Sequence, residues 1–126
     1  MIYGVGTDIV EINRIRKVIE KQKEAFLKRV FTQNEIREGN SRKKPGIYYA
    51  GRWAAKEALS KALGTGIGKE CNWTDIEISN EKHGSPKCSI FGNAQKLAKK
   101  NNINKIHVSI SHEQEYACST VILECR

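Results

Sequence analysis

The chain has 126 residues, which fits one domain over residues 1–126 with a modest core that would gain from further burial in an oligomer. Lys and Arg outnumber Asp and Glu by 22 to 14, and the net charge of +8 favours an anionic partner: nucleic acid, an anionic membrane surface, a phosphorylated small molecule or an acidic protein. No apolar run approaches the ~18 residues of a membrane span and no signal-peptide pattern is present, so we expect a cytoplasmic protein.

Four cysteines are present, and none of them form a C-x-x-C pair. In a cytoplasmic chain we expect them to be reduced core or surface thiols rather than a zinc site or a disulfide framework. They are Cys71, Cys88, Cys118 and Cys125.

The first half of the chain predicts one strand followed by helices. A short strand is expected over residues 1–6, and Asp8 follows two glycines at its end. Apolar residues then recur at helical spacing over residues 12–30, in a region that could break near Lys23. Thr32 and Glu35 have the spacing of a capping box, which would start a short helix that Gly39 can stop.

A long helix is predicted between Pro45, in its first turn, and Gly64, at its end. Its small and apolar residues cover one half of the circumference, and four other side chains are expected on the opposite half. The apolar half holds Ala54, Ala55, Ala58, Leu59, Ala62 and Leu63, and the other half holds Trp53, Glu57, Ser60 and Lys61.

Alternating residues follow the glycine-rich segment 64–68, whose glycine spacing does not match a Walker-type phosphate loop and favours a helix cap and turn. Residues 75–79 and 87–91 predict a hairpin, residues 93–100 a short helix, and residues 105–112 and 116–123 a final pair of strands. The order β-α-α-α-β-β-α-β-β predicts an α+β domain whose mostly antiparallel sheet packs against the long helix.

Two carboxylates surrounded by basic residues, Asp8 and Glu57, suggest a divalent metal that holds a polyphosphate. Simpler interpretations stand beside this one. Asp8 could cap the following helix, Glu57 could form an exposed pair with Lys61, and His112 could be a surface turn residue.

Taken together, four segments resemble the holo-acyl-carrier-protein synthases, a family of small 4'-phosphopantetheinyl transferases. They are D-I-V-E at 8–11, the run A-G-R-W-A-A-K-E-A-L-S-K-A-L-G-T-G-I-G at 50–68, N-E-K-H-G-S-P at 80–86 and H-V-S-I-S-H at 107–112. The resemblance covers essentially the whole chain. Trp53 stands where the family commonly has phenylalanine.

The resemblance implies transfer of the phosphopantetheine arm from coenzyme A to a serine of apo acyl carrier protein, in support of fatty acid biosynthesis. Asp8 and Glu57 would hold Mg²⁺, Lys61 would reach a phosphate, and His112 would lie near the coenzyme. The general base would be Glu57, a metal-bound water or another group.

The resemblance also implies a homotrimer with coenzyme A at the subunit interfaces. It assigns coenzyme contacts to Lys44, in the basic loop Arg42 to Lys44, and to Arg52, Trp53, Gly84 and Pro86. On the first helix, Arg14 and Lys21, with an apolar contact from Val18 or Phe26, would dock the acidic carrier.

Two other functions compete with this one. A nucleic-acid-binding module would account for the positive charge, but the chain has only nine aromatic residues and no recognition-helix or RNP-type motif. A scaffold that binds coenzyme A without turnover would not need the intact set of Asp8, Glu57 and Lys61. We therefore expect no nucleic-acid partner and no membrane partner.

Overall fold

A computed structural model describes the whole chain, residues 1–126. In chain order the elements are β1 (Ile2–Glu11), α1 (Ile12–Gln22), α2 (Glu24–Val30), α3 (Gln33–Asn40), α4 (Pro45–Leu63), the 3-10 turn η1 (Trp73–Asp75), β2 (Ile76–Asn80), β3 (Pro86–Ile90), α5 (Gly92–Lys100), β4 (Ile103–His112) and β5 (Tyr116–Cys125). No helix is both long enough and apolar enough to span a bilayer.

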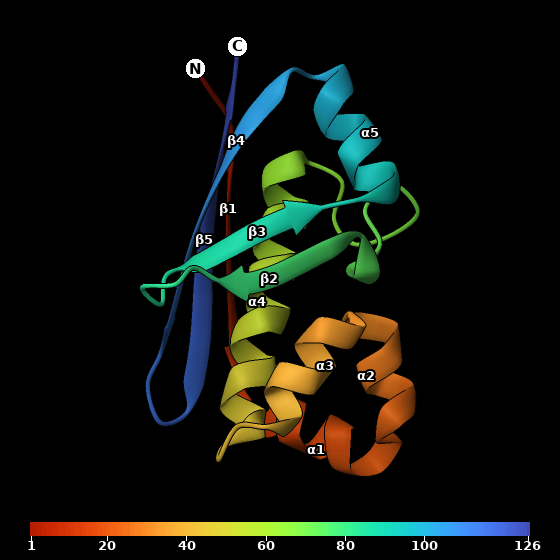
Figure 1. Cartoon of the computed structure of the whole chain (residues 1–126), viewed down its shortest axis with the longest axis vertical. Helices are drawn as coiled ribbons and strands as arrows, with labels where there is room; N and C mark the ends of the chain where they lie inside the picture. Colours follow the sequence, from red (N-terminus) through yellow and green to blue (C-terminus); the bar gives the residue numbers. More distant parts are fainter.

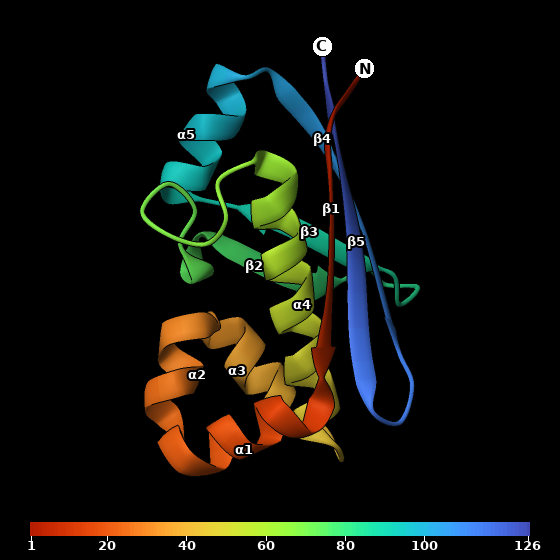
Figure 2. The same ribbon diagram turned by 180° about the vertical axis from the view of Figure 1, so that it is seen from behind.

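The long helix α4 lies between two antiparallel sheets (Figures 1 and 2). The larger sheet has the strand order β1-β5-β4, and the smaller one is the hairpin β2-β3. Helices α1 to α3 gather at one end of α4, while α5 and both chain termini lie at the other end (Figure 1). The predicted fold class is confirmed, and the strands divide into two sheets because α4 separates them.

Strand β1 is longer than the sequence indicated, and Asp8 lies inside it rather than at its end. The strand predicted over residues 1–6 is present, but its end was placed too early because the two glycines do not interrupt it. A Cβ atom at Gly6 would lie 1.8 Å from the carbonyl oxygen of Ala58, and one at Gly4 would lie 2.1 Å from that of Ala62. The glycines therefore let β1 pack directly against the backbone of α4.

The helical region divides at Lys23, whose φ of 51° ends α1 and starts α2. The capping box of Thr32 and Glu35 is present at the start of α3. Gly39 does not stop α3, which continues to Asn40. Instead, the ring of Tyr49 packs where a Cβ of Gly39 would be, so this glycine serves a close contact.

Helix α4 is buried on most of its surface, because sheets or helices cover nearly all sides of it. Every residue of the predicted apolar half is buried. Ser60, which was predicted on the opposite half, is also fully buried, and its hydroxyl donates to the carbonyl of Glu57 at 2.7 Å. The helix ends at Gly64 in the left-handed conformation, as predicted.

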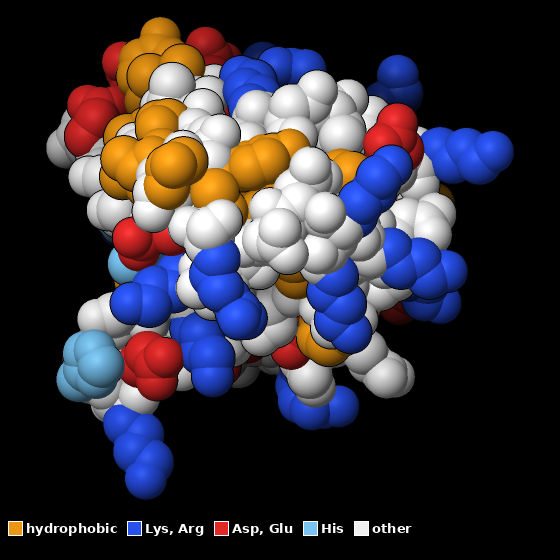
Figure 3. All heavy atoms as spheres, turned by 90° about the horizontal axis from the view of Figure 1, so that it is seen from above, with side chains coloured by type: hydrophobic (Ala, Val, Ile, Leu, Met, Phe, Trp, Pro, Cys, Tyr) orange, Lys and Arg blue, Asp and Glu red, His pale blue; other side chains and the backbone are white.

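The outer face of the larger sheet has no helix over it, and the exposed apolar residues of β1 point outward from it. Val5 and Ile9 are exposed, whereas Gly6 and Val10, which alternate with them, are buried against α4. Viewed from the end with the termini, apolar side chains gather on one side, and Lys and Arg side chains are spread over much of the remainder (Figure 3).

Candidate active site

Asp8 and Lys61 form the centre of the first group of charged residues. The ammonium Nζ of Lys61 donates to Oδ1 of Asp8 at 3.0 Å and to the carbonyl of Thr7 at 3.1 Å. The second carboxylate oxygen, Oδ2 of Asp8, is buried and has no hydrogen-bond partner. Asp8 does not cap α1, because Glu11 precedes that helix and makes no side-chain cap bond. The capping interpretation is therefore wrong.

Glu57 lies on α4 one turn before Lys61, and its carboxylate interacts electrostatically with that of Asp8. Burial, followed by the negative charge of Asp8, raises the pKa of Glu57, while the charges of Lys61 and Arg14 partly offset the rise. Lys61 pairs with Asp8 and not with Glu57. The interpretation of Glu57 as one half of an exposed surface pair is therefore wrong. We call Asp8, Glu57 and Lys61 the carboxylate cluster.

The carboxylate cluster suits a hard divalent cation. It offers oxygen ligands from two acidic side chains, and the unpartnered Oδ2 of Asp8 is a buried acceptor that lacks a donor. No group of three or more His, Cys, Asp or Glu residues gathers here or elsewhere in the chain. A site with two protein carboxylates fits Mg²⁺, which commonly completes its octahedron with water and phosphate oxygens.

Arg14 connects α1 to the carboxylate cluster. Its guanidinium carbon lies 5.7 Å from the centre of the Trp53 ring, which in turn packs against Trp73 with 5.5 Å between ring centres. Trp53 precedes Glu57 by one turn of α4. Trp53 therefore lies on the carboxylate side of α4.

A second group of charges lines a cavity of about 440 Å³ on another side of α4, which we call the cationic cavity. His112, at the end of β4, lies here and makes no hydrogen bond or ion pair with the carboxylate cluster. Five basic side chains and no acidic one line the cavity. These are Arg42, Lys43, Lys44, Arg52 and His112.

Arg52 forms the inner wall of the cationic cavity and ties it to the β2-β3 turn. Its Nη2 donates to the side-chain oxygen of Asn80, and the Asn80 amide nitrogen donates to the carbonyl of Gly84 at 2.9 Å. The Tyr48 ring centre lies 4.3 Å from the guanidinium carbon of Arg52 and 5.1 Å from that of Arg42. The turn is thus held beside the cavity, with Pro86 paired to Asn80 across the hairpin.

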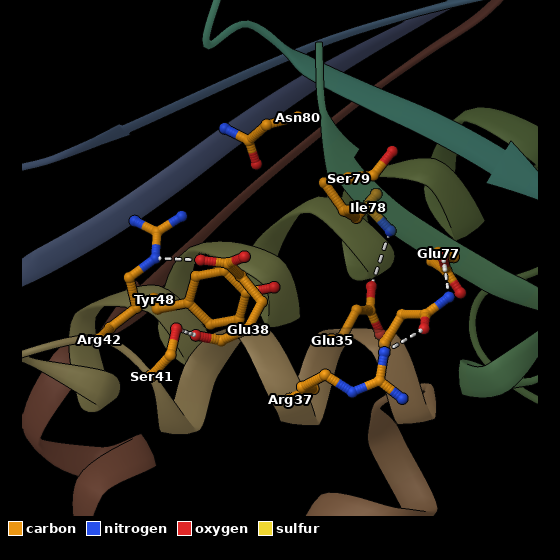
Figure 4. A pocket seen from close by; sticks show the side chains of 11 residues that line it. Glu35, Arg37, Glu38, Ser41, Arg42, Tyr48, Glu77, Ile78, Ser79 and Asn80 are labelled. Atoms are coloured by element: carbon orange, nitrogen blue, oxygen red, sulfur yellow. Dashed lines mark hydrogen bonds and ion pairs between the residues drawn. The ribbon is translucent and has the colours of Figure 1, made fainter. Parts of the chain in front are cut away.

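A larger cavity of about 680 Å³ lies between α3 and β2 (Figure 4). Arg42 and Tyr48 line both cavities, so the two hollows meet at these side chains. Arg42 donates from Nε to Oε2 of Glu38 at 2.7 Å, and Glu77 adds another negative charge. Its mixed charges make the larger cavity less suited to a polyphosphate than the cationic cavity.

Helix α4 holds the two sites on different sides. Arg52 and Glu57 are five residues apart, so their directions differ by about 140° around the helix axis. Arg52 reaches β2, whereas Glu57 faces β1. No hydrogen bond or ion pair joins the two sites within the chain. A single chain therefore brings together Asp8, Glu57 and Lys61, and separately Lys44, Arg52 and His112.

Comparison with known proteins identifies the family. Residues 4–121 match the model of the 4'-phosphopantetheinyl transferase superfamily. The chain belongs to this superfamily. It is 46% identical, over 100% of both chains, to a protein of Vibrio cholerae called holo-[acyl-carrier-protein] synthase. The resemblance predicted from the sequence is confirmed, and with it the enzyme class.

Two solved structures of transferases from this superfamily have the same fold. A holo-[acyl-carrier-protein] synthase from Neisseria meningitidis superposes with a TM-score of 0.92 at 36% identity, covering 98% of this chain and 99% of that one. A synthase from Bacillus anthracis, in complex with CoA (3',5'-ADP), superposes with a TM-score of 0.85 at 41% identity, covering 100% and 99%.

The structure adds residues to the candidate site that the sequence did not indicate. Tyr48 lies within the predicted long helix and no sequence pattern singled it out, but its ring lies between two arginines. Asn80 looked like a turn residue, but it joins Arg52 to the turn. Contacts of this kind join segments far apart in the sequence, and no local pattern signals them.

Proposed function

We propose that the chain transfers the 4'-phosphopantetheine arm of coenzyme A to a serine hydroxyl of apo acyl carrier protein, releases adenosine 3',5'-bisphosphate, and thereby supports fatty acid biosynthesis. One observation carries the proposal beyond family membership. The buried, unpartnered Oδ2 of Asp8 belongs to a carboxylate that Lys61 contacts and whose charge acts on Glu57, and this arrangement supports a site for a cation and a polyphosphate.

In the reaction, the serine oxygen forms a bond to the phosphorus that carries the pantetheine arm. The bond from that phosphorus to the bridging oxygen breaks, and the bisphosphate takes the electron pair. Asp8 and Glu57 would hold Mg²⁺, which would neutralise part of the negative charge that develops on the phosphates. Lys61 contributes a further positive charge from one turn along α4, and the serine proton passes to a nearby base.

The cationic cavity suits the nucleotide end of the coenzyme. Lys44 and His112 are exposed at its rim, and Arg52 contributes a positive charge from its wall. The Nε of Arg52 is buried without a partner. The turn at Gly84 and Pro86, held beside the cavity through Asn80, would contact the same end of the ligand.

We propose that the active unit is an oligomer, a trimer in which each coenzyme lies between two copies. Two observations support a second copy. The carboxylate cluster and the cationic cavity are separated by α4 within one chain, so two copies side by side would complete one site. The outer face of the β1-β5-β4 sheet exposes Val5 and Ile9, which a neighbouring copy would cover.

The acidic carrier docks on α1. Residues 14–29 hold seven basic residues against Glu20 and Glu24, a net charge of +5. Arg14 and Lys21 are exposed, and Val18 is half-buried beside Arg14 at a shallow hollow. Phe26 is 4% exposed and packs against Phe31, so it belongs to the core and Val18 is the apolar contact that remains.

Intact-mass analysis tests the function directly. Protein incubated with apo carrier, coenzyme A and Mg²⁺ should add one phosphopantetheine arm to the carrier. Asp8→Ala and Glu57→Ala should each abolish the addition, as should chelation, while the fold stays intact. A protein that binds nucleic acid tightly and leaves the carrier mass unchanged would favour the nucleic-acid alternative instead.

A further inference from the structure

We propose that Lys61 is the resident counter-ion of Asp8 in the metal-free enzyme, and that it competes with the divalent ion until coenzyme phosphates draw it away. The proposal rests on the magnesium site proposed above. In this proposal Lys61 acts before the reaction. Binding of the metal and binding of the coenzyme are coupled, because both displace the Lys61 side chain from Asp8.

The geometry places Lys61 where a cation is needed. The Asp8 side chain is only 12% exposed, and a carboxylate so enclosed needs a compensating charge. Nζ of Lys61 supplies it, with bonds to Oδ1 of Asp8 and to the carbonyl of Thr7. These two contacts hold the ammonium against β1, so in this arrangement it neutralises Asp8 rather than pointing toward solvent.

A divalent ion bound to Asp8 would meet this ammonium at close range. Mg²⁺ binds carboxylate oxygens at about 2.0–2.1 Å, so an ion that shares Oδ1 with Lys61 would lie within about 5 Å of Nζ. Two positive charges at this separation repel each other, least where water screens them and more strongly beside the buried carboxylate. This repulsion therefore lowers the affinity for the ion alone, and the departure of Lys61 would remove it.

Lys61 is able to leave. Its side chain is 50% exposed, and a lysine ammonium on a flexible four-carbon stem can turn outward from β1. Coenzyme phosphates that bind the ion would offer Nζ a new anionic partner on the solvent side. The coenzyme would therefore raise the affinity for the ion, and the ion would raise the affinity for the coenzyme by the same factor.

Binding of Mn²⁺, followed by the electron paramagnetic resonance signal of the free ion, tests the proposal without any turnover. Wild type, Lys61→Met and the distant exposed control Lys69→Met are each titrated with and without coenzyme A, after correction for ion bound by the coenzyme alone. Lys61→Met should bind Mn²⁺ alone about tenfold more tightly than wild type, because the competing charge is gone. Coenzyme A should then improve its Mn²⁺ affinity by a smaller factor than in wild type.

Melting temperatures give a second readout. Metal-free Lys61→Met should melt below wild type, because Asp8 has lost its counter-ion, and Mn²⁺ should raise its melting temperature more than that of wild type or Lys69→Met. Equal or weaker Mn²⁺ binding by Lys61→Met would overturn the proposal and leave the magnesium site standing. Absence of Mn²⁺ binding by every protein, with coenzyme A present, would overturn the magnesium site as well.

Discussion

Lys56 of α4 and Glu35 of α3 form an ion pair closed off from solvent, with 2.6 Å between Nζ and Oε1. Lys56 also donates to the carbonyls of Val30 at 2.8 Å and Trp73 at 3.1 Å, and the second oxygen of Glu35 accepts from the backbone N–H of Ile78 at 2.7 Å. The pair therefore ties α2, α3, η1 and β2 to α4, immediately before Glu57 in the chain.

Lys56→Met should lower the free energy of unfolding by about 3–5 kcal/mol, because it leaves the Glu35 carboxylate buried without its charge partner. Chemical denaturation measures the loss. Lys28→Met is the matched control: it breaks the exposed pair with Glu24, in which the two charges are 3.7 Å apart, and should cost about 0.2–1 kcal/mol or less. Similar losses for both variants would contradict a structural role for the buried pair.

Gly6→Ala should be strongly destabilising, at or above the upper end of the ~1–3 kcal/mol typical of overpacking. The added methyl group would lie 1.8 Å from the carbonyl oxygen of Ala58, so β1 has to move away from α4 and carry Asp8 with it. Activity should fall together with stability. Gly68→Ala is the control, because no atom lies within 4 Å of its added methyl group, and thermal melting should find it nearly unchanged.

The sequence predicts most of the elements of the fold but not the role of the glycines in β1. The amphipathic stretch over residues 12–30, the capping box of α3, the Pro45 and Gly64 limits of α4 and both hairpins follow from local patterns, and the structure has all of them. Gly4 and Gly6 misled the strand assignment because a glycine that breaks a strand and one that admits a neighbouring helix look the same in sequence.

The basic surroundings of Asp8 and Glu57 suggested a metal site, and the whole-chain resemblance strengthened that prediction. Taken singly, Asp8 and Glu57 favoured a helix cap and a surface pair, and the structure contradicts both interpretations. The separation of His112 from these residues could not be predicted, since it depends on how β4 and α4 pack. The buried pair of Lys56 and Glu35 joins residues 21 positions apart and leaves no local pattern either.

The pH dependence of metal binding should report the raised pKa of Glu57. A proton and a metal ion compete for the same carboxylate, so affinity for Mn²⁺ should be constant above that pKa and fall as pH drops through it. The fall should begin at a higher pH than the ordinary glutamate value of 4.5 would give. An onset at the pH of an ordinary glutamate would contradict the burial of Glu57.

The raised pKa of Glu57 also predicts how the stability of the fold changes with pH. A raised pKa in the folded state means that protonated Glu57 stabilises the fold below its unfolded-state pKa, and this contribution is lost as pH rises through the folded-state value. Metal-free Glu57→Gln should therefore be at least as stable as wild type at neutral pH. Its advantage should disappear in acid, which denaturation at several pH values would measure.

Charge reversal on α1 should affect the carrier and spare the coenzyme. Lys21→Glu should raise the KM for apo carrier while the KM for coenzyme A stays nearly unchanged. Arg14→Glu should also lower kcat, because the charge of Arg14 acts on Glu57. Salt should weaken carrier recognition by wild type, since exposed charges beyond ~8 Å are largely screened near physiological ionic strength.

The control for charge reversal is Lys99→Glu with Lys100→Glu on α5, at the opposite end of the molecule (Figure 1). Both side chains are exposed, and the double variant removes at least as much positive charge. If the double variant raised the KM for apo carrier as much as Lys21→Glu does, overall charge, and not α1, would recruit the carrier.

Mixing of two inactive variants tests the shared active site most directly. Asp8→Ala loses the carboxylate cluster, and Lys44→Ala with His112→Ala loses exposed side chains of the cationic cavity. If each site takes one group from each of two copies, random mixing should restore about a quarter of wild-type carrier loading, because one arrangement in four joins two intact halves. A mixture of Asp8→Ala with Glu57→Ala should stay inactive. Activity no higher than the average of the two parents in the first mixture would place the whole site within one chain and contradict the shared site.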